Sequence, residues 1–162
     1  MEINHAVVNR RDSLIADGEI TQLLTRVFVD GGYTEPAKAE HAFRPDALRK
    51  RGETLLAVAE GRLLGLVICA NAASPARQVA EPNEAEMHLL AVDPASRGQG
   101  VGFSLVAAFE QQANAIGLFR LVLSTQPAMT DAHRIYERHG YQRNPSQDWK
   151  KGDKAYLVYE KR

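Results

Sequence analysis

The chain has 162 residues, of which 44% are hydrophobic and 25% are charged, values typical of a globular protein, and we expect a single domain over residues 1–162. Its 20 Lys and Arg residues balance its 20 Asp and Glu residues, which argues against nucleic acid as the main partner because phosphates attract a cationic surface. Cys69 is the only cysteine, so an internal disulfide and a cysteine metal cluster are excluded, and no metal is expected.

The beginning of the chain predicts a cytoplasmic protein. Residues Met1 to His5 are not a basic segment followed by an apolar one, which argues against a signal peptide. No apolar run approaches the roughly 20 residues that a membrane-spanning helix needs. We therefore expect no membrane partner.

The first third of the chain predicts one strand and two helices. Ile3 to Val8 is the predicted strand, and Pro36 begins a second helix that continues unevenly to about Lys50. Between them, a helix capped by Asp12 or Ser13 ends at Gly31-Gly32. Its apolar residues recur at the spacing of one helical face: Leu14, Ile15, Ile20, Leu23, Leu24, Val27 and Phe28.

The middle of the chain has the pattern of strands. Thr54 to Ala59 and Arg62 to Ala72 form a predicted hairpin around the turn Glu60-Gly61. Ala73 to Asn83 contains two prolines and is predicted to be an exposed loop. Glu84 to Val92 is a further predicted strand.

The second half alternates helices and strands. The mixed order of elements predicts an α/β domain of the layered α+β kind. Its predicted elements are a glycine-rich turn at Arg97 to Gly102, a helix from about Gly100 to Ile116, a strand at Leu118 to Ser124, a helix capped by Thr130 or Asp131 and ending at His139, and two last strands from Tyr141 onward and at Ala155 to Glu160.

The glycine-rich turn between a strand and a helix is a candidate phosphate site. Glycines let the backbone approach a ligand, and the following helix presents free N–H groups and the positive end of its dipole. Arg97 adds a positive charge. The turn is not a dinucleotide motif, because the sixth position counted from Gly98 is Phe103, and it lacks the Lys and Ser or Thr of a Walker loop. A glycine-rich connector without a ligand is the alternative.

The residues around this turn resemble a known family. Leu89 to Pro94, followed by the spacing of Arg97, Gly100 and Gly102, resembles motif A of the GNAT acetyltransferases, and Ala132 to Tyr141 is similar to their motif B. The resemblance covers about Leu55 to Tyr141. It implies a mixed, mostly antiparallel central sheet of six to seven strands flanked by about four helices, and an enzyme that transfers the acetyl group of acetyl-CoA to an amine.

The resemblance also implies where acetyl-CoA binds. The pantetheine arm would lie between two splayed strands, and a backbone N–H near Leu90 would donate to the thioester oxygen. Met129 stands where many members carry an Asn that touches this arm, so that contact is not carried over. The implied binding residues are Leu90, Ala91 and Val92 for the arm, and Arg97, Gly98, Gln99, Gly100, Val101 and Gly102 for the pyrophosphate.

Tyr136, Glu86 and His88 are the candidate catalytic residues. Tyr136 occupies the family's general-acid position, and a phenol, with a usual pKa of about 10, can share a proton with a leaving thiolate; the alternative is a tyrosine packed on its helix with its hydroxyl at the surface. Glu86 and His88 share one strand face, at positions where members carry either histidines or a glutamate as the base. Glu86 would need burial to raise its pKa into the useful range. The alternative for this pair is a solvated polar strand face.

Several points stay open at this level. The acceptor is a small amine, an amino acid, an antibiotic or a protein amine, and the protein is a monomer or a homodimer. The competing interpretation is an acyl-CoA-binding sensor domain without turnover. The retention of all three candidate catalytic residues argues against it. The basic residues Arg49, Lys50, Arg51, Lys150 and Lys151 are expected on the solvated surface.

Overall fold

A computed structural model describes residues 4–162, so Ile3, the start of the predicted first strand, lies outside the described residues. Eight strands form a sheet in the order β1-β2-β3-β4-β5-β8-β6, with β7 paired to β8 outside this path. Only β4 and β5 run parallel. The strands are β1 (Ala6–Asn9), β2 (Glu53–Ala59), β3 (Arg62–Asn71), β4 (Glu84–Val92), β5 (Arg120–Thr125), β6 (Gln142–Arg143), β7 (Trp149–Lys151) and β8 (Lys154–Lys161).

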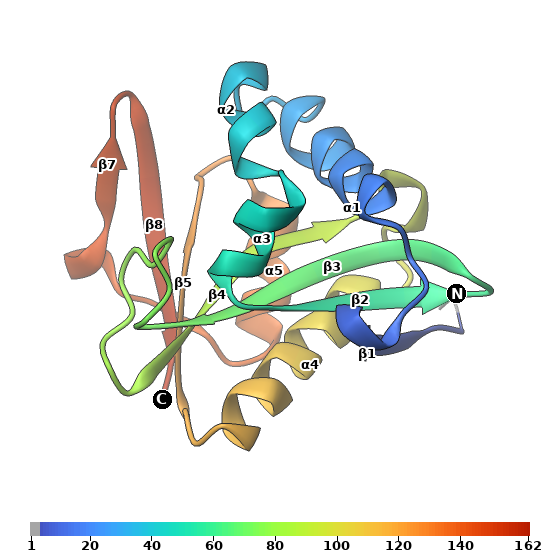
Figure 1. Ribbon diagram of the computed structural model, residues 1–162. Coiled ribbons are helices and arrows are strands. Elements are labelled where there is room, and N and C mark those ends of the chain that lie inside the picture. Colours follow the sequence, from blue (N-terminus) through green and yellow to red (C-terminus); the bar gives the residue numbers. More distant parts are fainter. Residues whose placement is uncertain (1–3) are drawn as a thin grey trace.

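Helices cover both faces of this sheet, so the expected layered fold class is confirmed. In Figure 1, α1, α2 and α3 lie on one side of the sheet and α4 lies on the other. One apolar cluster joins α1–α3 to β2 and β3, and a second joins α4 and α5 to the opposite sheet face. The α-helices of the described part are α1 (Asp17–Leu24), α2 (Pro36–Ala42), α3 (Pro45–Arg51), α4 (Val101–Ala115) and α5 (Thr130–Arg138). Within residues 4–162, no helix is both long and apolar enough to cross a lipid bilayer.

The apolar period of α4 predicted its buried face correctly over most of its length. Val101, Leu105, Phe109 and Ala113 are all buried against the sheet, as a spacing of three to four residues requires. Ile116, predicted at the end of this face, is 52% exposed. It is the residue that follows the last helical position, where the chain has already turned away from the sheet.

The predicted start of the first helix is wrong. Neither Asp12 nor Ser13 caps it, because α1 begins only after Ala16, whose N–H donates to the carboxylate of Glu19 over 3.1 Å. Leu14, predicted on the buried face, therefore lies before the helix and is fully exposed.

The predicted second helix is two helices. α2 ends at Ala42 and α3 begins at Pro45. A proline clashes with a helical conformation at the residue before it, and Arg44 is accordingly extended, with φ −64° and ψ 144°. The predicted cap of the last helix also differs. Met129, rather than Thr130 or Asp131, is the residue before α5 and provides no side-chain cap.

The carboxyl-terminal region contains one strand that the sequence pattern did not indicate. β7 is three residues long and pairs with β8. Its Trp149 stacks on Tyr156, with ring centroids 4.2 Å apart, and donates its indole N–H to Ser124 Oγ over 2.9 Å. The other two residues of β7 are exposed lysines, so β7 lacks an alternating apolar pattern.

Strand β4 separates from β5 partway along its length. The two strands pair only from Glu84 to Met87 of β4, although β4 continues to Val92. On its other side, the register with β3 shifts after His88, and Leu89 has a φ of +53°. These features define a β-bulge, which bends a strand. The bulge opens a gap between β4 and β5.

Candidate active site

The glycine-rich turn leads directly into α4. Gly98 and Gly100 have φ values of +76° and +83°, a conformation that glycine adopts readily. No side chain caps the helix at Gly100, so the N–H groups of its first turn have no partner within the helix. A Cβ at Gly102 would lie 2.7 Å from Ile135 Cδ1, so α4 and α5 approach closely here. The turn therefore presents free donors that suit an anion.

A cavity of about 710 Å³ lies over this turn. Its walls come from β4 beyond the bulge, the first turn of α4 and one face of α5. Val27 and Phe28 line it from the opposite sheet face, where a π-helical turn, η2 (Thr25–Val29), continues α1. The lining residues thus come from both faces of the sheet, next to the part of β4 that no longer pairs with β5. The volume of the cavity and the free donors of the turn suit a ligand with an anionic part.

Most of the predicted cofactor residues line this cavity. Ala91 is an exception, because its side chain is buried in the cluster beneath α1–α3, and Gln99 is likewise not among the lining residues. Met129 lines the cavity, with its sulfur 3.6 Å from Thr125 Oγ1, so a thioether occupies this part of the wall. The predicted residues that do line it are Leu90, Val92, Arg97, Gly98, Gly100, Val101 and Gly102.

Glu86 is an anchored carboxylate inside the protein. It is 1% exposed and accepts the backbone N–H groups of Gln78, Val79 and Ala80 over 2.8, 2.7 and 2.8 Å. These donors belong to the loop at residues 73–83, which is mostly exposed as predicted but folds back over the strand and fully buries Ala80. Burial raises the pKa of Glu86, but the hydrogen bond and the charge interaction with His88, together with the backbone N–H groups of Val79 and Gln78, outweigh burial and lower the pKa. The carboxylate is therefore ionised, and the raised pKa that base chemistry would need is not found.

His88 lies next to Glu86 on the same face of β4, as the strand alternation predicted. It is 7% exposed, and its Nε2 contacts a carboxylate oxygen of Glu86. Its other ring nitrogen, Nδ1, lies 3.3 Å from Nη1 of Arg51. A guanidinium can only donate, so Nδ1 accepts from Arg51 and Nε2–H donates to Glu86. The two partners thus select one neutral tautomer, with its lone pair on Nδ1.

Arg51 is the site residue that the sequence analysis missed. It was expected on the solvated surface, but it ends α3 and is half-buried against β4. Burial lowers the pKa of Arg51, and the charge of Glu86 opposes this effect. The one local feature of the sequence that relates to this burial is the glycine that follows Arg51. A Cβ added at Gly52 would lie 2.1 Å from the carbonyl oxygen of Cys69. That close approach holds the end of α3 against the sheet.

Tyr136 lies in the core beside the cavity. It is 6% exposed and packs between the rings of Tyr141 and Tyr159, with centroid distances of 6.1 and 5.8 Å. Burial, and secondarily the neighbouring Tyr159, raises the pKa of Tyr136, so its hydroxyl keeps its proton at neutral pH. Tyr136 does not itself line the cavity, but the preceding Ile135 does.

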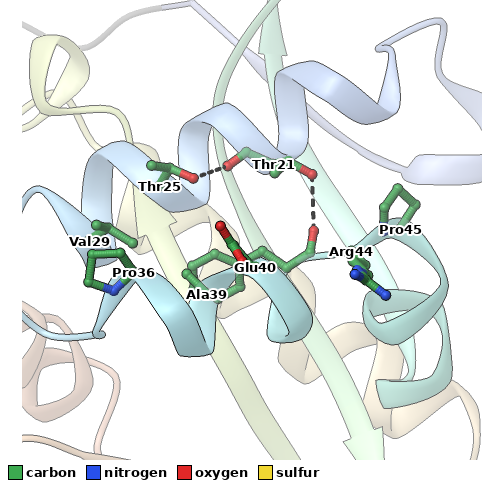
Figure 2. Close-up of a pocket in the computed structure, with 9 residues that line it drawn as sticks. Thr21, Thr25, Val29, Pro36, Ala39, Glu40, Arg44 and Pro45 are labelled. Atoms are coloured by element: carbon green, nitrogen blue, oxygen red, sulfur yellow. Dashed lines mark hydrogen bonds between the residues drawn. The ribbon is translucent and has the colours of Figure 1, made fainter.

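A smaller cavity lies away from these residues. It measures about 360 Å³ and is lined by residues of α1, η2, α2 and the start of α3 (Figure 2). Its hydroxyl groups are engaged, because Thr25 donates to the carbonyl of Thr21 over 2.9 Å and Thr21 donates to the carbonyl of Phe43 over 3.0 Å. It shares no lining residue with the larger cavity.

Comparison with known proteins connects this geometry to one family. The sequence model described as the acetyltransferase (GNAT) family matches residues 18–141. The curated aminoalkylphosphonate N-acetyltransferase of Salmonella typhimurium is 41% identical over 59 residues, which are 36% of this chain and 38% of that protein. The chain thus matches well under half the length of this relative.

Solved structures share the fold over nearly the whole chain. An acetyltransferase from Streptococcus agalactiae superposes with a TM-score of 0.74 at 17% identity, covering 97% of each chain. The PaiA N-acetyltransferase from Thermoplasma acidophilum, solved in complex with coenzyme A, gives a TM-score of 0.72 at 14% identity, covering 96% of this chain and 99% of that one. At these identities the likeness concerns the fold.

Proposed function

The chain belongs to the acetyltransferase (GNAT) family, and we propose that it transfers the acetyl group of acetyl-CoA to a primary amine. The observation that carries the proposal is the separation of β4 from β5 beyond Met87, next to a turn whose backbone donors are free. A cavity of about 710 Å³ lies over this turn and beside β4 beyond the bulge. An elongated ligand with a narrow arm and a pyrophosphate fits these features.

Acetyl-CoA would supply an activated acetyl group. In the proposed arrangement, the backbone amides from Arg97 to Gly102 hold its pyrophosphate, and Leu90 and Val92 contact its arm. The N–H of Leu90 donates to the thioester oxygen and stabilises the negative charge that develops there. Leu90 follows the bulge and has no register partner on β3 or β5, which supports this role for its backbone.

His88 is the proposed base, and Glu86 is its positioning residue. The amine must lose a proton before it can attack, and the lone pair that can take the proton is on Nδ1 of His88. Glu86 keeps the other proton on Nε2 and stabilises the imidazolium that forms, as a buried carboxylate does beside other catalytic histidines. His88 precedes the bulge at Leu89 and Leu90 follows it, so the proposed base and the proposed oxyanion donor lie on either side of the bulge.

Tyr136 is the proposed acid. The amine nitrogen forms a bond to the carbonyl carbon and releases its second proton to solvent, while the carbon–sulfur bond breaks and its electron pair leaves on sulfur. The Tyr136 hydroxyl gives its proton to this sulfur and recovers a proton from the imidazolium through solvent. Starting from an ammonium, the overall reaction yields the amide, the thiol and one proton.

An acceptor screen tests this function. Thiol release from acetyl-CoA is measured with small amines, amino acids, aminoalkylphosphonates, aminoglycoside antibiotics and peptides with free amines. Aminoalkylphosphonates are included because the curated relative is named for them. Amine-dependent release, with an acetylated product detected by mass spectrometry, supports the proposal. Tight acetyl-CoA binding by calorimetry without turnover of any amine would favour the sensor interpretation instead.

A further inference from the structure

Arg51 is a half-buried cation without an anionic partner of its own. Among residues 4–162, no carboxylate lies within 4.0 Å of its guanidinium, although nine ion pairs between an Arg or Lys and a carboxylate are formed elsewhere in that part of the chain. The nearby carboxylate of Glu86 already accepts three backbone N–H groups and contacts His88. Within the described part of the chain, the only side-chain hydrogen-bond partner of Arg51 is the neutral Nδ1 of His88, and a guanidinium binds an anion far better than a neutral acceptor.

The fold holds Arg51 in this place. Glu53 begins β2 opposite Cys69 of β3, and the adjacent Ile68 is opposite His88 of β4. Arg51 lies two residues before β2, and its side chain reaches across β3 to His88 of β4. The close packing of Gly52 on Cys69 fixes the chain just before this crossing, so the guanidinium is positioned by the backbone.

We propose that Arg51 binds a carboxylate or phosphonate group of the acceptor, and that the acceptor is therefore a short amine carrying an acidic group. This inference rests on the proposed acetyl transfer. Because Nη1 and Nδ1 are 3.3 Å apart, an acid on Arg51 and an amine at Nδ1 are separated by only a few bonds. Short amino acids and aminoalkylphosphonates meet this requirement.

The same contact explains how the acceptor exposes the base. In the structure, the Arg51 N–H occupies the lone pair on which His88 would take the proton. An acidic group that pairs with the guanidinium draws this N–H away and leaves Nδ1 for the amine. An amine without an acidic group has to displace Arg51 without compensation, so Arg51 selects against it.

The test compares matched acceptors on the full chain. The pairs are β-alanine with β-alaninamide, and 2-aminoethylphosphonate with its diethyl ester, assayed by thiol release from acetyl-CoA. The variants are Arg51→Met, Arg51→Lys and the control Arg49→Met. Arg49 is on the same helix but is 57% exposed beside Asp17, so its variant loses the same charge from the surface.

The wild type should favour the acidic member of at least one pair by roughly 10- to 100-fold in kcat/KM, as expected for a charged hydrogen-bonded pair. The carboxylate and phosphonate arms decide which acid is preferred. Arg51→Met should remove the preference mainly through KM, Arg51→Lys should restore part of it, and Arg49→Met should keep it. A wild type without preference, or an Arg51→Met variant that retains it, overturns the inference while leaving the acetyl transfer intact.

A binding measurement distinguishes failure of the proposed acetyl transfer from failure of the proposed anion site at Arg51. If no amine is turned over, the acetyl transfer fails, and calorimetric titration of β-alanine and 2-aminoethylphosphonate into the CoA-loaded protein still tests Arg51. Binding to the wild type that is lost in Arg51→Met supports the anion site. Equal binding to both, or binding to neither, overturns it. Circular dichroism and thermal unfolding establish that each variant is folded.

Discussion

Replacing Glu86 by Gln distinguishes an anchoring carboxylate from a proton acceptor. Each carboxylate oxygen of Glu86 has two partners: Oε1 accepts from Val79 and Ala80, and Oε2 accepts from Gln78 and contacts His88. Gln has one oxygen and one NH2 group. Whichever way the amide is turned, its NH2 faces two groups that are donors in the wild type.

The expected loss of stability follows from this mismatch. An unsatisfied buried donor destabilises the fold by about 1–3 kcal/mol. Two such donors lower the free energy of unfolding by roughly 2–4 kcal/mol if the amide turns its NH2 toward the more exposed pair of donors. For a chain of this length, that corresponds to a decrease of about 10 °C in the unfolding temperature. If the NH2 faces His88, the ring must accept on Nε2, and its Nδ1–H then opposes the Arg51 guanidinium, so kcat should also fall.

Urea and thermal unfolding at several pH values measure the effect. The pKa of Glu86 is lowered in the folded protein, so its ionised form stabilises the fold above the ordinary carboxyl pKa, and this contribution is lost as pH falls through the folded value. The difference in free energy of unfolding between the wild type and Glu86→Gln should therefore become smaller below about pH 4.5. Glu53→Gln is the control, because Glu53 accepts from Asn9 and Arg11 near the surface, and it should change stability by less than about 1 kcal/mol. A Glu86→Gln variant as stable as the wild type but with kcat lowered about 100-fold would show that Glu86 is the proton acceptor.

Three further predictions concern the cofactor site, the acid and the core. Gly100→Ala and Gly100→Glu both place a side chain at φ +83°, but only Glu adds an anion beside the proposed pyrophosphate. Calorimetry should therefore show that Gly100→Glu weakens acetyl-CoA binding at least about tenfold more than Gly100→Ala does. Equal affinities of the two variants would show that the turn is not part of the acetyl-CoA site. Tyr136→Phe should lower kcat by about 10²–10⁴ at nearly constant acetyl-CoA affinity, and a folded variant with wild-type kcat in single-turnover assays would exclude the acid role. Burial raises the pKa of Cys69 to about 12, so the unfolded chain ionises first and stability should fall above about pH 9 by up to about 1.4 kcal/mol per pH unit. Urea unfolding of Cys69→Ala should show a shallower decrease, and an unchanged slope would contradict this assignment.

The sequence by itself was sufficient for the features that depend on local constraints. The apolar period of α4 identified its buried face, and the glycines at positions 98 and 100 occupy the left-handed conformation that favours glycine. The alternation of β4 placed Glu86 and His88 on one face. Two motifs in the right order then indicated the family, which the match over residues 18–141 confirms. Capping was less predictable, because several polar residues near the start of α1 could each begin a helix.

Only the tertiary structure decided what surrounds the candidate base. The loop donors of Glu86 lie six to eight residues away along the chain, and Arg51 lies 37 residues from His88. In the sequence, Arg51 belongs to an ordinary basic run at the end of a helix. Its contact with His88 depends on the register of three strands and on the approach of Gly52 to Cys69. Strand register and backbone packing join distant segments, so no local pattern of residue types could show that this arginine faces the site.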